Sequence, residues 1–274
     1  MKTRIIAAAV LLPLLLIVLI ALPPVCTGVL VAAMSAVAAY ELLWGAKLVK
    51  HPRLIAYTMI AAATTGMWCY FGSPYGFGLA ASLIFCCLLW GEMLIAKAKL
   101  PFEKVLVCIA GGLLIPYLLS AIVRIRNMEL GAVYVLMPFA LAFLSDSGAY
   151  FAGMFLGKHK LAPTISPKKT VEGLFGGIAG AILGMMIFGL VLSLGFHQRV
   201  NFLIAIVYGI LGSLASVLGD LTFSVIKRQA GIKDYGNLIP GHGGILDRFD
   251  SMTIVAPLTE AMLIIIPIAE KING

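Results

Sequence analysis

Long apolar stretches recur along almost the whole chain, separated by short polar or turn segments. Each holds about 18–24 residues, and a helix of that length, rising about 1.5 Å per residue, can cross a hydrocarbon core roughly 30 Å thick. Nine such stretches are predicted, near residues 5–22, 25–45, 54–72, 76–96, 105–123, 131–155, 173–195, 201–223 and 251–268. The sequence therefore predicts an all-α integral membrane protein, a polytopic bundle of about nine transmembrane helices.

The composition leaves few other classes of protein open. Of the 274 residues, 61% are apolar and 12% are charged, and the mean hydropathy is +1.05. A soluble domain needs a polar shell that so few charged residues cannot supply. An ordinary soluble enzyme, a disordered protein and a secreted disulfide scaffold are therefore excluded.

The net charge of +8 is explained mainly by orientation in the membrane. If the N-terminus is cytoplasmic, the predicted inner side holds 16 of the 20 Lys and Arg residues. This bias follows the positive-inside rule. We therefore expect a cytoplasmic N-terminus, inner loops that face anionic lipid headgroups, and no nucleic-acid partner.

Polar residues gather in the second half of the chain. Two long inner loops, near 156–172 and 224–250, hold eight of the inner basic residues and most of the unusual polar side chains. We predict that residues 1–130 form an N-terminal transmembrane half for packing or oligomerisation. Residues 131–274 are predicted to form a C-terminal transmembrane half that carries the catalytic groups.

An acidic residue near the inner end of the eighth stretch stands out. One face of the predicted helix carries Ser216, Asp220, Ser224 and Lys227, spaced i, i+4, i+8 and i+11. A carboxylate at the centre of a transmembrane helix costs about 2.5–3.5 kcal/mol, so such residues usually line a cavity or pair. Two interpretations stay open at this point: a polar packing seam with a neighbouring lysine, or a functional site.

The segment that follows combines acids, bases and glycines. Gly241, Gly243 and Gly244 allow positive φ and close backbone approach, and successive amides in such a turn can bind an anion. Asp247 and Asp250 are three residues apart, so both can face one side as the last helix begins. Carboxylates beside Lys, Arg and a Gly-rich turn suit Mg²⁺ and phosphates together.

Residues 224–250 resemble the signature of the phosphatidate cytidylyltransferase family (CDP-diacylglycerol synthases). That signature runs Ser, one residue, apolar, Lys-Arg, four residues, Lys-Asp, then Pro or Gly, one residue, His-Gly-Gly, apolar, one residue, Asp-Arg, apolar, Asp. The segment matches it at every fixed position over 27 residues. The many spans, the length and the polarity toward the C-terminus are also similar to that family.

The resemblance implies a defined reaction. Phosphatidate from the bilayer attacks the α-phosphorus of CTP, giving CDP-diacylglycerol and pyrophosphate, with Mg²⁺ as cofactor and a second cation left open. It also implies a homodimer through membrane helices. We expect a multi-pass protein of a bacterial cytoplasmic (inner) membrane, with the active site facing the cytoplasm.

Site roles follow from the resemblance and from side-chain chemistry. The expected metal ligands and catalytic carboxylates are Asp220, Asp247 and Asp250. The other expected catalytic groups are Lys227, Arg228 and His242, the last of which orients a phosphate or holds the turn. The expected phosphate contacts are Lys168, Lys169, Thr170, Ser224, Lys233, Gly243, Gly244 and Arg248. Supporting roles are expected for Asp146, Ser216 and Asp234, unless Asp234 only pairs with Lys233.

Two upstream segments look similar to supporting motifs of the family. Asp146 lies deep in the sixth stretch, as part of a packing seam or beside the site. In the inner loop before the seventh stretch, Ser166-Pro167 is predicted to cap a helix, so that Lys168 and Lys169 would precede a helix N-terminus that binds anions. The alternative for that loop is an ordinary basic inner loop.

Other features of the spans have structural interpretations. The seventh stretch carries a glycine stripe that is predicted to let another helix approach closely. Glu41 and Glu92 lie near inner ends of their spans, where they can reach the interface or pair with Lys47 and Lys97. Neither these acids nor Glu260 is expected to be catalytic.

Two other functions remain as alternatives. A related CTP-dependent enzyme could act on another membrane lipid, which the acceptor preference in a lipid panel would reveal. A cation or phosphate transporter would explain acids in the membrane and basic loops. It would not explain why the distinctive groups crowd into one inner segment, and ion flux into liposomes without CTP would support it.

Overall fold

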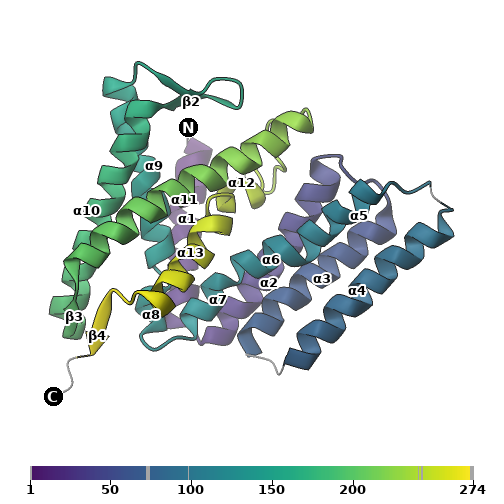
Figure 1. The fold of residues 1–274 in the computed structure, drawn as a ribbon, viewed down its shortest axis with the longest axis horizontal. Helices are drawn as coiled ribbons and strands as arrows, with labels where there is room; N and C mark the ends of the chain where they lie inside the picture. The colour runs from purple at the N-terminus through teal and green to yellow at the C-terminus, as the bar shows by residue number, and fades with distance from the viewer. Residues whose placement is uncertain (1, 72–74, 98, 240, 242, 272–274) are drawn as a thin grey trace. The chain divides into compact units, whose positions relative to one another are not determined.

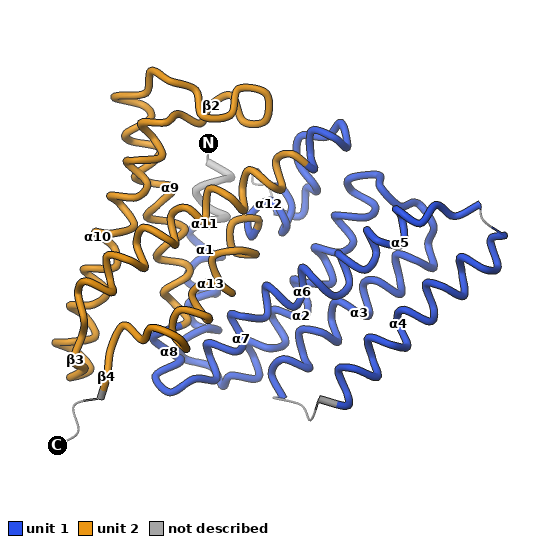
Figure 2. Tube along the Cα trace, viewed as in Figure 1, with its two compact units in different colours: residues 1–134, 226–249 blue, residues 135–225, 250–274 orange. Residues whose placement is uncertain are grey.

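The computed structural model describes residues 2–71, 75–97, 99–239, 241 and 243–271, with the backbone alone for 2–8, 75 and 271. These residues form two compact units (Figure 2). Unit 1 comprises residues 1–134 and 226–249, and unit 2 comprises residues 135–225 and 250–274. The predicted functional division at residue 130 stays a prediction.

Unit 1 is built from apolar helices (Figure 1). Its first four helices are α1 (Lys2–Leu16), α2 (Pro24–Tyr40), α3 (Pro52–Phe71) and α4 (Tyr75–Ile95). The rest are α5 (Phe102–Ile109), α6 (Ile115–Leu119), α7 (Ala121–Arg126), α8 (Gly131–Tyr134) and α12 (Leu246–Phe249). Three π-helical segments extend or join them: η1 (Ile17–Ala21), η2 (Glu41–Gly45) and η3 (Ala110–Leu114). Within this unit α2 and α3 lie side by side.

Unit 2 contains the longest helices and two short β-ribbons. Its helices are α9 (Met137–Leu156), α10 (Val171–Phe196), α11 (Phe202–Gln229, whose last turn belongs to unit 1) and α13 (Met252–Ile265). Strands β1 (Lys160–Ala162) and β2 (Ser166–Thr170) pair antiparallel, as do β3 (Gln198–Val200) and β4 (Ala269–Lys271).

Seven helical segments among the described residues are long and apolar enough to cross a membrane. They are Pro24–Gly45, Pro52–Phe71, Gly76–Ile95, Phe102–Arg126, Gly131–Leu156, Val171–Phe196 and Phe202–Gln229, which correspond to the second to eighth predicted stretches. The first stretch corresponds to α1 and η1, which run without a break over Lys2–Ala21, and the ninth corresponds to the shorter apolar helix Met252–Ile265. The all-α polytopic membrane fold is confirmed, whereas the count of nine crossings and the cytoplasmic N-terminus stay predictions.

Helix boundaries follow local chemistry, with one prediction overturned. Pro24 and Pro52 are the first residues of α2 and α3, where a missing N–H costs nothing. Ser166-Pro167 was expected to cap a helix, which is wrong: both residues lie in strand β2. The residue before a proline disfavours the helical region, and the true N-cap is Thr170, whose hydroxyl accepts from Gly173 N at 3.1 Å.

The predicted glycine stripe of α10 is confirmed as a close helix contact in unit 2. It packs along α9, and the two helices lie side by side (Figure 1). A Cβ built on Gly180 would lie 2.5 Å from the carbonyl oxygen of Leu144. One built on Gly176 would collide with the methyl group of Ala152 and meet the carbonyl oxygen of Gly148 at 2.7 Å. The backbones of α9 and α10 can approach this closely only because the stripe has no side chains.

We predict that Gly176→Ala lowers the thermal unfolding temperature of the detergent-solubilised protein by several degrees. The new methyl group overpacks the helix contact, a defect that typically costs about 1–3 kcal/mol, more than alanine gains as a helix former. Gly195→Ala is the matched control on the same helix, since a Cβ at Gly195 meets nothing within 4 Å. Circular dichroism measures both variants, and equal shifts for the two would contradict close packing along the stripe.

Candidate functional site

In unit 1 the Asp247 carboxylate is the centre of a buried polar cluster. Its Oδ1 accepts a hydrogen bond from the Lys227 ammonium, with 2.9 Å between Oδ1 and Nζ. Its Oδ2 accepts from the backbone N–H groups of Tyr235, at 2.8 Å, and Gly244, at 3.0 Å. Asp247 is only 8% exposed, so its charge depends on these three donors instead of water. The cluster holds the backbone at Tyr235 and at Gly244 against one carboxylate beside one lysine.

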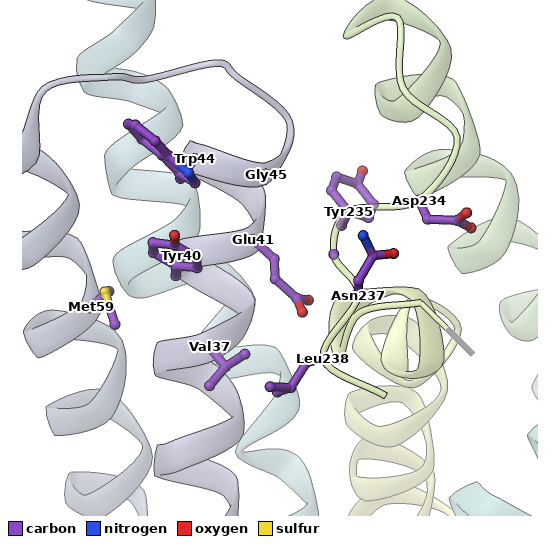
Figure 3. Close-up of a pocket in the computed structure, with 11 residues that line it drawn as sticks. Val37, Tyr40, Glu41, Trp44, Gly45, Met59, Asp234, Tyr235, Asn237 and Leu238 are labelled. Carbon is purple, nitrogen blue, oxygen red and sulfur yellow. The ribbon is translucent and has the colours of Figure 1, made fainter. Parts of the chain in front are cut away.

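A second carboxylate holds the same loop and was not foreseen as part of the site. Glu41, the first residue of η2, accepts from Ile245 N through Oε1 at 3.0 Å and from Leu246 N through Oε2 at 2.8 Å. Figure 3 shows its side chain extending from the helix toward the loop that carries Tyr235 and Asn237. Glu41 is 4% exposed and takes up two N–H groups at the start of α12 that the helix itself cannot satisfy.

Three glycines make room for this contact in unit 1. A Cβ on Gly236 would lie 2.6 Å from Glu41 Oε1, and one on Gly244 would collide with both carboxylate oxygens. On the helix side, a Cβ on Gly45 would collide with the carbonyl oxygen of Tyr235. The loop can lie against the end of α2 only because all three positions lack a side chain.

Of the two alternatives for these acids, reaching the interface or pairing with Lys47 and Lys97, the structure shows neither lysine pair among the residues it describes and gives both acids other partners. Glu41 bonds to loop amides, as above, and not to Lys47. Glu92 lies 3.5 Å from Arg53 Nη1 and accepts a hydrogen bond from the Tyr57 hydroxyl at 3.4 Å. The sequence did mark Glu41, because it is a carboxylate in an apolar span. Its partners lie more than 200 residues away, and no local pattern points to them.

In unit 2 a second lysine–carboxylate pair joins Lys169 of β2 to Asp220 of α11. Lys169 Nζ lies 2.5 Å from Asp220 Oδ2, and the Ser224 hydroxyl donates to Asp220 Oδ1 at 3.3 Å. This bond agrees with the predicted common face of Asp220 and Ser224. Asp146 of α9 interacts electrostatically with both Lys169 and Asp220. Residues predicted from three separate segments therefore come together in this unit.

The remaining residues of unit 2 that were singled out have more local contacts. Asp250 Oδ1 accepts from Ser251 N at 2.7 Å, so this buried carboxylate fixes the turn before α13. The Ser216 hydroxyl is buried and makes no hydrogen bond to any described residue. Thr170 caps α10, and Lys168 lies exposed on β2.

The Gly-rich turn of unit 1 borders a polar cavity of about 380 Å³. Gly241 and Gly243 have φ of 75° and 86°, the positive values expected for them. The described residues that line the cavity are Lys233, Asp234, Asn237, Ile239, Gly241, Gly243 and Arg248. Arg228 is exposed and donates to the Ile232 carbonyl at 3.4 Å. His242 lies outside the described residues.

The donor groups in both units suit a hard cation together with phosphates. Mg²⁺ takes one or two carboxylates and completes its shell with water and substrate oxygens. Asp220 pairs with Lys169, and Asp146 lies near enough to both residues to interact with their charges. Within the described ranges, no cluster of three or more His, Cys, Asp or Glu side chains suitable for a metal is found. The chemistry of the donors therefore fits magnesium, with phosphate oxygens needed as further ligands.

Comparison with known proteins gives consistent matches. The model of the cytidylyltransferase family matches residues 2–266. A protein of Bacillus subtilis (strain 168) named phosphatidate cytidylyltransferase is 36% identical over 239 residues, which are 86% of this chain and 87% of that protein. Proteins of the same name from Staphylococcus epidermidis and Staphylococcus aureus are 46% and 44% identical. Those two matches span 49% of this chain and about half the length of each staphylococcal protein.

The family match covers parts of both compact units and includes both lysine–carboxylate pairs, Lys169 with Asp220 and Lys227 with Asp247. With nearly the whole length matched, the chain belongs to the cytidylyltransferase family.

Proposed function

We propose that this protein is a phosphatidate cytidylyltransferase, which converts CTP and phosphatidate into CDP-diacylglycerol and pyrophosphate for phospholipid synthesis. The observation that carries the proposal is the Asp247 carboxylate, held by Lys227 and two loop amides inside the segment that matches the family signature. The Bacillus subtilis relative that bears this name supports it over most of its length.

The reaction joins two anions, and the proposed residues address that problem. An oxygen of the lipid phosphate forms a bond to the α-phosphorus of CTP, and the bond from that phosphorus to the pyrophosphate oxygen breaks. Without cations the two phosphates repel each other. The proposed sources of positive charge are Lys168, Lys169, Lys227, Arg228, Lys233 and Arg248, and the amide of Gly243 is a proposed neutral donor. Ser224 and the amide of Gly244 donate to Asp220 and Asp247 in the structure, so each would exchange that bond for one to a phosphate.

Magnesium is the proposed cofactor, and when bound it would neutralise and align the phosphates. Asp220, Asp247 and Asp250 are its proposed ligands on the strength of the sequence pattern, with Asp146, Ser216 and Asp234 as supporting groups. Lys169 and Lys227 lie against Asp220 and Asp247 and help to orient these two carboxylates.

Location and assembly extend the proposal. The seven long apolar helices found among the described residues support a multi-pass membrane protein. A bacterial inner membrane and an active site on the cytoplasmic side are proposed from the loop charges, and cysteine labelling of the loop at 156–172 from each side would test them. A homodimer is proposed from the family resemblance. Light scattering of the protein–detergent complex measures the molar mass of the protein and so tests the oligomeric state.

The direct test uses the purified full chain in mixed micelles with phosphatidate, CTP labelled at the α-phosphate and Mg²⁺. We expect labelled CDP-diacylglycerol and release of pyrophosphate. A panel with polyprenyl phosphate and ether-lipid acceptors tests the related lipid enzymes. If the folded protein makes no CDP-lipid from any acceptor, the proposal is wrong.

We predict that Asp247→Asn lowers turnover at least about a hundredfold, because the site loses a charge in the place where phosphates and cations meet. The change also breaks the buried pair with Lys227, so thermal unfolding is measured in parallel. Glu103→Gln, at an exposed acid of α5, is the control and should retain activity. Full turnover in Asp247→Asn would remove this residue from the mechanism.

We predict that Glu41→Gln lowers kcat and also costs about 1–3 kcal/mol of unfolding free energy. The amide group turns a donor toward one of the two loop N–H groups, so one buried hydrogen bond is lost and the loop that carries Asp247 shifts. Glu92→Gln is the matched control, since Glu92 is a buried acid of the same unit that does not touch the loop. An equal loss of kcat in both variants would contradict a specific role for Glu41.

We predict that chelation of divalent ions abolishes activity and that Asp220→Asn raises the Mg²⁺ concentration for half-maximal activity roughly tenfold or more. The neutral amide is a weaker ligand and a weaker partner for Lys169. Glu270→Gln, an exposed acid in the same unit, should leave the Mg²⁺ dependence unchanged. Mg²⁺ titrations of initial rates measure both variants, and overlapping curves would exclude Asp220 as a ligand.

A further inference from the structure

A second cavity of unit 1 lies at the C-terminal end of α2. Its volume is about 530 Å³, within the roughly 300–1,000 Å³ usual for small-molecule sites. It opens between the last turns of α2 with η2, Met59 of α3, and the loop of residues 234–238 (Figure 3). None of the residues expected to bind phosphate lines it.

The walls of this cavity are amphipathic. The helix side presents Val37, Tyr40, Trp44 and Met59, and the loop adds Leu238. Tyr40, Trp44 and Leu238 are exposed on its surface. The loop side also presents the polar side chains of Asp234 and Asn237 (Figure 3). Tyrosine and tryptophan at the end of an apolar helix are typical of the level where lipid headgroups begin. Such walls suit a molecule with an apolar body and a polar end.

The same loop separates this cavity from the polar cavity of the Gly-rich turn. Asp234 and Asn237 line both, so the two cavities are neighbours on either side of one strip of backbone. The polar cavity is also lined by Lys233 and Arg248, whose two positive charges exceed the one negative charge of Asp234. An apolar cavity therefore adjoins a cationic one, and Glu41 fixes the loop between them with both carboxylate oxygens.

We infer that the cavity lined by Tyr40, Trp44 and Met59 binds the glycerol backbone and the upper acyl chains of phosphatidate, and that Lys233 and Arg248 hold its phosphate. The inference rests on the proposed function and assigns the lipid substrate to these walls. In this arrangement the glycerol esters lie beside Asn237, and the acyl chains run along the aromatic side chains toward the bilayer. The phosphate passes over the loop and lies in the cationic cavity.

The kinetic test compares Trp44→Ala with Trp90→Ala. Both tryptophans are about half exposed, at 51% and 48%, but Trp90 lies on α4 and does not line the cavity. We expect Trp44→Ala to raise the KM for phosphatidate about tenfold, measured as a mole fraction in mixed micelles, because apolar contact with the lipid is lost. The KM for CTP should stay unchanged, and Trp90→Ala should behave as wild type. An unchanged phosphatidate KM in Trp44→Ala, or equal rises in both variants, would overturn the inference.

A second readout does not depend on turnover. Phosphatidate with a photoreactive diazirine near the carbonyl end of one acyl chain is activated on the wild-type protein without CTP. Label is expected on residues 37–59 and 234–238, and it should fall with unlabelled phosphatidate but not with phosphatidylcholine. Met59→Trp, which fills the cavity, should abolish it. Label spread evenly over α4, or competition by phosphatidylcholine, would indicate general lipid contact and overturn the inference.

The two proposals fail in distinguishable ways. A wild-type protein that makes no CDP-diacylglycerol refutes the proposed function, while the labelling still tests the cavity. An active wild type with label outside the cavity refutes only the lipid assignment.

Discussion

Two buried carboxylates hold the backbone at Tyr235 and at residues 244–246 in place, and the candidate site of unit 1 is built on these contacts. Asp247 accepts hydrogen bonds from Lys227 and from the amides of Tyr235 and Gly244. Glu41 accepts from the amides of Ile245 and Leu246. An unpaired backbone N–H in such surroundings costs about 1–3 kcal/mol, so four amides and one ammonium strongly favour this loop conformation. The glycines are required by the same contact, since side chains at Gly236 and Gly244 would push Glu41 away.

Much of the fold could be predicted from the sequence because the bilayer allows so few solutions. A span must satisfy its own backbone, so apolar stretches of sufficient length become helices, and among the described residues seven of the predicted stretches form helices long enough to cross a membrane. Glycines at helical spacing predicted, for an equally local reason, that another helix packs closely on α10, and the structure shows that this helix is α9. The ninth stretch is shorter in the structure, as α13, and Ser166-Pro167 pairs in a ribbon. There, contacts with other segments decide the conformation.

The contacts of the site could be predicted only where the two partners lie close together in the sequence. The spacing of Asp220 and Ser224 predicted a shared helix face, and they are hydrogen bonded. The choice between a packing seam and a functional site could not be made from that face alone, because the partner, Lys169, lies on a distant β-ribbon. Glu41 shows the same limit more strongly. Its sequence neighbours are apolar, and no nearby residue predicts that it accepts hydrogen bonds from the amides of Ile245 and Leu246.

The pairing of each acid with a lysine has a consequence for phosphate chemistry. A carboxylate and an ammonium together are neutral, and a buried neutral pair is far less costly than either ion alone. A phosphate that approaches Lys227 or Lys169 competes with Asp247 or Asp220 for the ammonium, and the carboxylate then needs another cation. Phosphate and divalent ion together restore the charge balance that either one alone would disturb. Under the proposed function, this exchange within each pair separately would favour a nucleotide with its magnesium over a free anion.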